Sequence, residues 1–197
     1  MQTSRRTVIL ISMINLTALV NNSSAKAYPG TETELTLAEQ SPDYLKPFID
    51  KPILFGQGKY SFWGFDVYQA KLWTESSNFQ TDTWHQHRFA LELTYLRDAE
   101  GKKIAKRSIE EITKQNELPQ AKSQSWLLAL EKLFPNVKKT QTITGIYIPN
   151  NGAKFFHENS FLGEINDPEF SRSFFDIWFS NQTSAPDLKK KLFRENK

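Results

Sequence analysis

The spacing of hydrophobic residues changes abruptly in the middle of this chain. In residues 89–95 bulky apolar side chains alternate with smaller or more polar ones, which predicts a strand with one buried face and one more polar face. In residues 102–117 apolar side chains recur every three or four positions, which predicts an amphipathic helix that ends before Pro119. A second helix with an apolar stripe follows and ends at Pro135. The chain therefore has to combine a sheet with helices.

The predicted strands and helices come in blocks and do not alternate. Residues 53–73 are rich in β-branched and aromatic side chains and predict two successive strands. Three more strands are predicted at residues 140–148, 153–157 and 161–165. Asp167 is expected to cap one closing helix, and Ser184 with Asp187 to form a capping box for another that ends near Phe193. This order predicts an α+β fold, a large antiparallel sheet with a helical layer on one face, and argues against a doubly wound sheet.

Composition and charge exclude several classes of function. The 197 residues include no cysteine, which excludes disulfides, thiol nucleophiles and cysteine-ligated metal sites. Three of the 25 basic residues and none of the 22 acidic residues lie in positions 1–27, so 22 basic residues balance 22 acidic ones in the remainder. Such a neutral body lacks the clustered positive field that a phosphate backbone requires. We therefore expect no nucleic-acid partner.

The first 27 residues have the order of a secretory signal peptide. A start containing Arg5 and Arg6 is followed by an apolar run at 7–20 and by Ala25-Lys26-Ala27, which predicts cleavage after Ala27. The apolar run has 14 residues, whereas a transmembrane helix needs about 20. A retained anchor and a twin-arginine route are the alternatives.

The predicted export sets the expected domain plan and location. Residues 1–27 are the signal peptide, 28–47 a tether or edge segment, and 48–197 a single domain. We expect a periplasmic or secreted protein with no integral membrane segment after cleavage. A body without cysteine suits an oxidising compartment.

No sequence motif for covalent, cofactor or metal catalysis is found. The G-x-S-x-G, P-loop and Rossmann glycine patterns are absent, so no catalytic residue and no cofactor are assigned. His85 and His87 would share one face of a strand, and His157 or a carboxylate could complete a metal site. Two histidines near a strand start are more often surface residues, so we assign no metal ion.

Bulky aromatic residues crowd the first predicted hairpin. They are Phe62, Trp63, Phe65, Tyr68 and Trp73. One face of this hairpin should meet the helices, where the aromatic layer either fills a solid core, the commoner outcome, or lines an apolar cleft. If a cleft exists, the nearby polar groups able to hold a carboxylate or phenolate are Lys59, Tyr60, Arg97 and Arg107.

The hairpin also carries a family resemblance. Residues 56–73 read GQGKYSFWGFDVYQAKLW and resemble the G-x-G…VY-x-A-x-L-[YW] hairpin of bacterial chalcone isomerase-like proteins, and residues 91–98 resemble the family's next strand and turn. Further similarities follow in order at Gly152-x-x-x-Phe156, Leu162-Gly163, Asp167-Pro168-x-Phe170, Phe174-Phe175-Asp176-Ile177-Trp178 and Ser184-Ala185-Pro186-x-Leu188. The resemblance spans about residues 48–193 and implies an open-faced β-sandwich with a ligand cleft between sheet and helices.

The resemblance implies a binding protein and not a working isomerase. Plant chalcone isomerases orient a phenolate with an arginine on the first hairpin strand and a threonine shortly before the VY pair. Here Trp63 stands at the threonine position, and Tyr60 or Lys59 at the arginine position. Because non-catalytic plant relatives bind fatty acids, we expect the cleft, with Trp63 in it, to hold a fatty acid or similar small apolar or amphipathic anion.

Two other functions are left open by the sequence. One is an intramolecular lyase acting on chalcone-like enones, in which Tyr60 or Lys59 would stabilise the oxyanion. The other is an envelope interaction module, which would have a solid core and a large exposed apolar patch.

Overall fold

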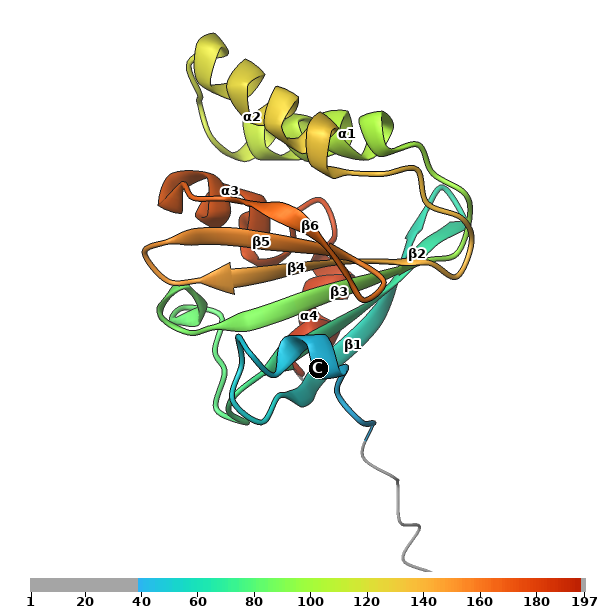
Figure 1. The fold of residues 1–197 in the computed structure, drawn as a ribbon, viewed down its shortest axis with the longest axis vertical. Helices are drawn as coiled ribbons and strands as arrows, with labels where there is room; N and C mark the ends of the chain where they lie inside the picture. The colour runs from blue at the N-terminus through green and yellow to red at the C-terminus, as the bar shows by residue number, and fades with distance from the viewer. Residues whose placement is uncertain (1–38, 196–197) are drawn as a thin grey trace, which may run out of the picture. The chain divides into compact units, whose positions relative to one another are not determined.

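A single antiparallel sheet organises the described part of the chain, residues 39–195 of the computed structural model (Figure 1). Its six strands neighbour one another in the order in which they occur in the sequence. They are β1 Ile53–Phe62, β2 Phe65–Thr74, β3 Phe89–Tyr95, β4 Thr142–Ile148, β5 Gly152–His157 and β6 Ser160–Ile165. Every strand predicted from the sequence is present, and the short connections explain why consecutive strands pair antiparallel.

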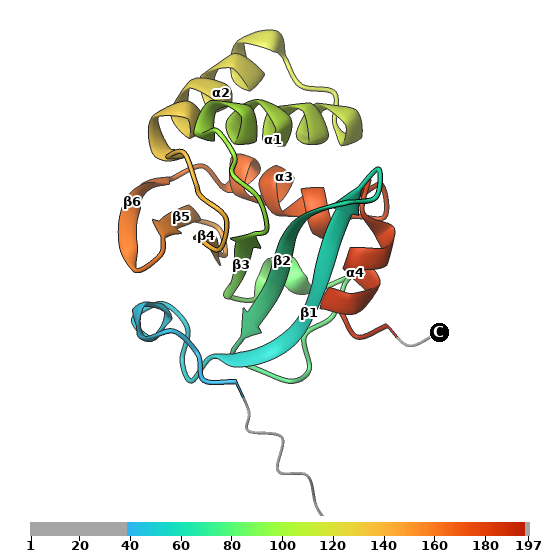
Figure 2. The same ribbon diagram turned by 90° about the vertical axis from the view of Figure 1, so that its right-hand side faces the viewer.

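Four α-helices form a layer on one side of this sheet. They are α1 Gly101–Gln115, α2 Gln120–Leu133, α3 Pro168–Phe179 and α4 Pro186–Leu192. Helix α3 packs on β5 and α4 on β1 and β2, while α1 packs on α2 and α3 (Figure 2). This arrangement confirms the predicted α+β fold with an open-faced antiparallel sheet. Short 3-10 helices at Asp43–Leu45 and Trp84–Gln86 complete the described elements.

The core between sheet and helices is built largely from aromatic rings. Phe175 of α3 meets Phe89 of β3 edge to face, with 4.8 Å between ring centroids. Gly145 of β4 lies beneath the Phe175 ring, and a Cβ atom there would come within 3.1 Å of that ring. Helix α3, which carries Phe175, begins at an N-cap. The Asp167 carboxylate accepts hydrogen bonds from the backbone N–H groups of Glu169 and Phe170. The predicted cap at Asp167 is therefore confirmed.

The capping box predicted for the last helix is wrong. Helix α4 begins after Ala185 and has no side-chain cap. The Ser184 hydroxyl instead donates a hydrogen bond of 2.6 Å to Glu111 on α1. The reason is that the N-cap position falls on Ala185, whose side chain has no acceptor, so Ser184 lies one residue before the position from which it could cap the helix.

The opposite face of the sheet is covered in part by residues 42–49. Leu45 and Ile49 are fully buried against Trp73 and Ile146 on that face. As a result β3 is buried on both faces, including the more polar one, where Glu92 is only 7% exposed. The expected boundary between tether and domain at residue 48 falls inside this packed segment.

The sequence also raised expectations about a signal peptide, membrane segments and metal sites. The predicted signal peptide and residues 28–38 lie outside residues 39–195. Within that range no helix is both long and apolar enough to cross a membrane. Nor do three His, Asp or Glu side chains gather there in a way that could hold a metal ion.

Candidate functional site

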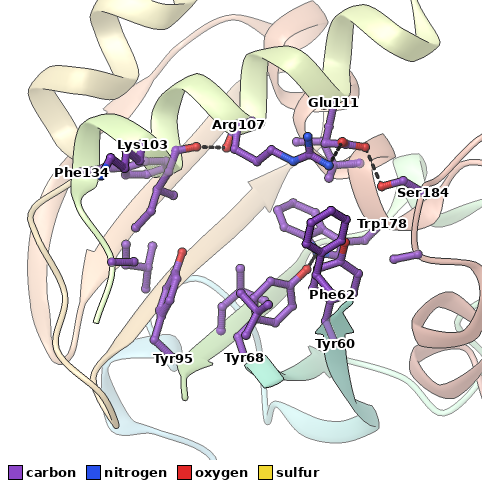
Figure 3. A pocket seen from close by; sticks show the side chains of 18 of the residues that line it. Tyr60, Phe62, Tyr68, Tyr95, Lys103, Arg107, Glu111, Phe134, Trp178 and Ser184 are labelled. Atoms are coloured by element: carbon purple, nitrogen blue, oxygen red, sulfur yellow. Dashed lines mark hydrogen bonds and ion pairs between the residues drawn. The ribbon is translucent and has the colours of Figure 1, made fainter. Parts of the chain in front are cut away.

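A cavity of about 410 Å³ opens between the sheet and helices α1 and α3. Figure 3 shows side chains from β1, β2 and β3 on one side and from α1 on the other. Its apolar wall includes Phe62, Val67, Leu93, Ile104, Phe134, Ile143, Phe174, Ile177 and Trp178. Of the two outcomes left open by the sequence, the structure has the cleft. Cavities of 300–1,000 Å³ are the usual size of small-molecule sites.

Three tyrosines form a row across the floor of the cavity. Tyr60 pairs with Tyr68 across β1 and β2, and Tyr68 pairs with Tyr95 across β2 and β3. The Tyr60 and Tyr68 rings stack with centroids 5.1 Å apart, and the Tyr68 and Tyr95 rings meet edge to face at 6.2 Å. Because cross-strand partners point to the same face of a sheet, all three rings face the helices. This row, with its hydroxyl groups, is the main polar feature of the floor.

A bulge in the first hairpin shapes this floor. The register between β1 and β2 shifts just after the Tyr60–Tyr68 pair, so Ser61 pairs with Asp66. Val67 is left without a partner on β1, and its side chain lines the cavity together with that of Tyr68. Successive side chains in a regular strand would point to opposite faces, so the bulge is what brings both to one site.

The hydroxyl groups of Tyr68 and Tyr95 are neutral hydrogen-bonding groups. Burial raises the pKa values of Tyr68 and Tyr95 far above the ordinary range of a phenol. The Tyr68 hydroxyl accepts a bond of 2.9 Å from Trp178 Nε1, which leaves its proton free to donate. The Tyr95 hydroxyl has no hydrogen-bond partner within residues 39–195. The floor thus offers donors and carries no negative charge.

An ion-pair cluster lies on the helical side of the cavity. Glu111 Oε1 lies 2.5 Å from Arg107 Nη2 and 2.7 Å from Lys114 Nζ, and its other oxygen accepts the bond from Ser184 (Figure 3). Burial alone would raise the pKa of the Glu111 carboxyl, but the bonds from Lys114 and Ser184 and the charge of Arg107 outweigh it and hold the pKa below its usual value. The carboxylate therefore stays ionised and fixes Arg107 beside the cavity.

Arg107 retains binding capacity in this position. Its side chain is 47% exposed, and its guanidinium carries more N–H groups than its contacts with Glu110 and Glu111 use. Lys103, one turn earlier on α1, also lines the cavity. The arrangement can therefore hold an apolar body against the floor and a polar or anionic group near α1.

Of the five residues that the sequence singles out, two line the cavity and three do not. Tyr60 and Arg107 are lining residues. Lys59 points away and forms an ion pair of 2.7 Å with Asp66, and Arg97 lies over the exposed Phe65 ring at 5.9 Å. The strand alternation accounts for Lys59, since Tyr60 takes the face toward the helices.

The expectation that Trp63 lies in the cleft is wrong. Trp63 and Gly64 both have positive φ angles, 50° and 80°, at the turn between β1 and β2. Positive φ at both central residues is the hallmark of a tight type I′ hairpin turn. The turn directs the Trp63 side chain into solvent, where it is 87% exposed.

Several lining residues escaped the sequence analysis. Tyr95 lies at the end of a strand that was predicted correctly, and its alternation with Leu93 and Leu91 was the available signal for its face. Glu111 and Ser184 carry no such signal, because they meet only when α1 packs beside the start of α4.

The fold and the cavity define this chain as an α+β protein with an open-faced sheet and a cleft of ligand size. A family model described as chalcone isomerase-like matches residues 49–193, well over half of the chain. The protein therefore belongs to the chalcone isomerase-like family, as the hairpin resemblance indicated.

Two individual proteins are similar to this chain, one in sequence and one in structure. An uncharacterized protein of Haemophilus influenzae is 26% identical over 142 residues, which cover 72% of this chain and 68% of that protein. The crystal structure of a fatty-acid binding protein from Arabidopsis thaliana is similar with a TM-score of 0.55 at 13% identity, covering 73% of this chain and 87% of that one. At this identity the second similarity concerns the fold.

Proposed function

We propose that this protein binds a fatty acid, or a similar small amphipathic anion, in the cavity between its sheet and helices, without converting it chemically. The observation that carries the proposal is an apolar cavity of about 410 Å³ with the Arg107 guanidinium on its helical side. Burying a hydrocarbon chain there gains about 25 cal/mol for each Å² withdrawn from water. The similarity in fold to a plant fatty-acid binding protein supports the same ligand class.

The polar groups suggest how such a ligand would be oriented. A carboxylate near α1 would accept hydrogen bonds from the Arg107 guanidinium. The hydrocarbon chain would lie over the floor against apolar side chains such as Leu93 and Ile143. The alternative function, an intramolecular lyase, gains no specific support, because the position expected to hold its threonine lies in the exposed turn at Trp63.

A fluorescent fatty acid tests the proposal directly. The probe is 11-dansylamino-undecanoic acid, titrated into the purified protein and then displaced with lauric acid. Saturable binding with displacement is the expected result, and a probe signal that lauric acid leaves unchanged would overturn the proposal. Naringenin chalcone added to the same protein should cyclise only at its spontaneous rate, and a faster rate would favour the lyase.

Two pairs of variants locate the binding. Ser108 is buried on α1 and lines the cavity, so Ser108→Phe fills the site and should weaken binding tenfold or more. Ser125→Phe makes the same change on the exposed side of α2 and should leave binding unchanged. Arg107→Gln should weaken lauric acid more than dodecanol, while Lys102→Gln, exposed on the same helix, should not discriminate between them.

We also propose that the protein is exported, on the basis of the order of charged, apolar and small residues in positions 1–27. N-terminal sequencing of protein recovered from the periplasmic or culture fraction of the producing bacterium is the test. A mature chain beginning at Tyr28 is expected, and full-length protein found only in the cytoplasm would contradict export.

A further inference from the structure

The tip of the β1–β2 hairpin exposes three aromatic side chains in four consecutive residues. Phe62 is 51%, Trp63 87% and Phe65 66% exposed. The remaining large exposed hydrophobic residues in positions 39–195 are Ile53, Leu128 and Phe161, which lie on three other elements or ends of elements. Single exposed apolar residues are ordinary, but a contiguous group marks an interaction surface. Figure 2 shows the hairpin reaching past the end of β3.

Cationic side chains border this tip. The Arg97 guanidinium lies 5.9 Å from the centre of the Phe65 ring, and the Arg107 guanidinium 6.0 Å from that of Phe62. Arg97 forms no ion pair within the described part of the chain. The nearby carboxylates are already paired with cations, Asp66 with Lys59, and Glu110 and Glu111 with Arg107.

The size of the tip limits what it can bind. Aromatic side chains have about 150–250 Å² of surface each, so the exposed parts of the three rings amount to on the order of 400 Å². A stable protein–protein interface buries about 800 Å² on each partner. A narrow apolar projection flanked by arginine is matched better by a bilayer, where aromatic rings settle at the interface and basic side chains meet anionic headgroups.

We propose that the tip formed by Phe62, Trp63 and Phe65 docks on the surface of a phospholipid bilayer, with Arg97 against anionic headgroups. Phe62 belongs both to the tip and to the lining of the cavity. A docked tip therefore places one side of the cavity at the lipid surface, so an apolar ligand would pass between bilayer and cavity with little exposure to water. The docking itself rests on the exposed tip and does not depend on what the cavity holds.

The tryptophans of the chain make the proposal measurable. Trp63 is exposed, whereas Trp73, Trp84, Trp126 and Trp178 are all 6% exposed or less. Vesicles of phosphatidylcholine with one third phosphatidylglycerol, brominated on their acyl chains, should quench the Trp63 emission and shift it to the blue. Quenching by the zwitterionic vesicles alone should be weaker, and added salt should reduce the difference.

Variants separate the tip from the rest of the surface. Measured by co-sedimentation with the vesicles, which needs no Trp63 emission, Trp63→Ser and Phe65→Ser should each lower the vesicle partition coefficient about tenfold, as expected for one aromatic ring withdrawn from water. Phe161→Ser removes a ring of similar exposure on β6 and should have no effect. The proposal would be overturned if the wild-type protein bound neither kind of vesicle, or if Phe161→Ser lowered binding as much as the tip variants do. A dimer in solution that depends on Trp63 would also overturn it.

Discussion

The indole Nε1 of Trp178 donates a hydrogen bond of 2.9 Å to the hydroxyl of Tyr68. Tyr68 lies on β2 and Trp178 on α3, so this bond ties the sheet to the helical layer at the wall of the cavity. Trp178 is buried, and water cannot readily replace its acceptor. The bond therefore contributes to holding the helical layer on the sheet.

Replacing Tyr68 with phenylalanine should destabilise the protein. The substitution leaves the buried indole N–H without an acceptor, which costs about 1–3 kcal/mol. Urea unfolding followed by circular dichroism measures the change. Tyr60→Phe is the matched control, because the Tyr60 hydroxyl bonds no residue in the described range, and its effect should stay within about 0.5 kcal/mol. Equal losses in the two variants would show that the Trp178 bond contributes nothing.

The carboxylate of Glu111 should stabilise the fold at neutral pH and lose this effect in acid. Its folded pKa lies below the ordinary 4.5, so its contribution is complete above that value and disappears as the pH falls through the folded pKa. Glu111→Gln should cost about 1.5–3 kcal/mol at pH 7, because charge-assisted bonds from Arg107 and Lys114 are lost. The difference between variant and wild type should shrink as the pH falls below 4.5 and vanish below the folded pKa. A constant difference across this range would contradict the assignment.

Glu92 should have the opposite pH dependence. Burial beneath residues 42–49 raises its pKa above the ordinary 4.5, against the attraction of Lys71, whose Nζ lies 3.9 Å away. A raised carboxyl pKa means that the folded state binds the extra proton, so stability falls as the pH rises above 4.5 toward the folded pKa. Glu92→Gln should be more stable than the wild type at pH 7 and equal to it at pH 4. In Lys71→Met the fall in stability with rising pH should be larger than in the wild type, because the charge that attracts the Glu92 carboxylate is gone. An unchanged fall would argue that Glu92 is not its origin.

The spacing of hydrophobic residues was sufficient to predict the strands and helices and their arrangement in layers. Spacing alone predicts a strand at residues 89–95 and a helix at residues 102–117. The order of strands and helices in blocks predicts an antiparallel sheet with helices on one face. The open cleft was one of two expected outcomes, because an aromatic stripe looks the same whether it fills a core or lines a cavity.

The site residues needed information that is not local. The tyrosine row depends on the register of three strands, and one bulge after Tyr60 decides which side chains share a face. Trp63 was expected in the cleft because the family resemblance places it at the threonine position of the isomerases, but the positive φ angles of the turn send its side chain outward. The burial of Glu92 depends on Leu45 and Ile49, which return to cover the sheet from a segment expected to belong largely to a tether.

Gly56 should be indispensable for the docking of α4. A Cβ atom on Gly56 would lie 2.0 Å from the backbone oxygen of Leu192, so an added methyl group must displace the end of the helix. Gly56→Ala should therefore cost about 1–3 kcal/mol in urea unfolding and accelerate amide exchange in residues 186–192.

Gly64→Asn is the appropriate control for this prediction. Gly64 has a φ of 80°, and a Cβ atom added there would meet no other atom within 4 Å. Asparagine also tolerates left-handed backbone better than most other side chains. Its stability loss should be smaller, and exchange in α4 should be unchanged. The two glycines belong to the same hairpin, so the comparison isolates the contact with α4. If the amides of α4 exchanged no faster in Gly56→Ala than in the wild type, the helix would adapt to the methyl group and close packing would not be required.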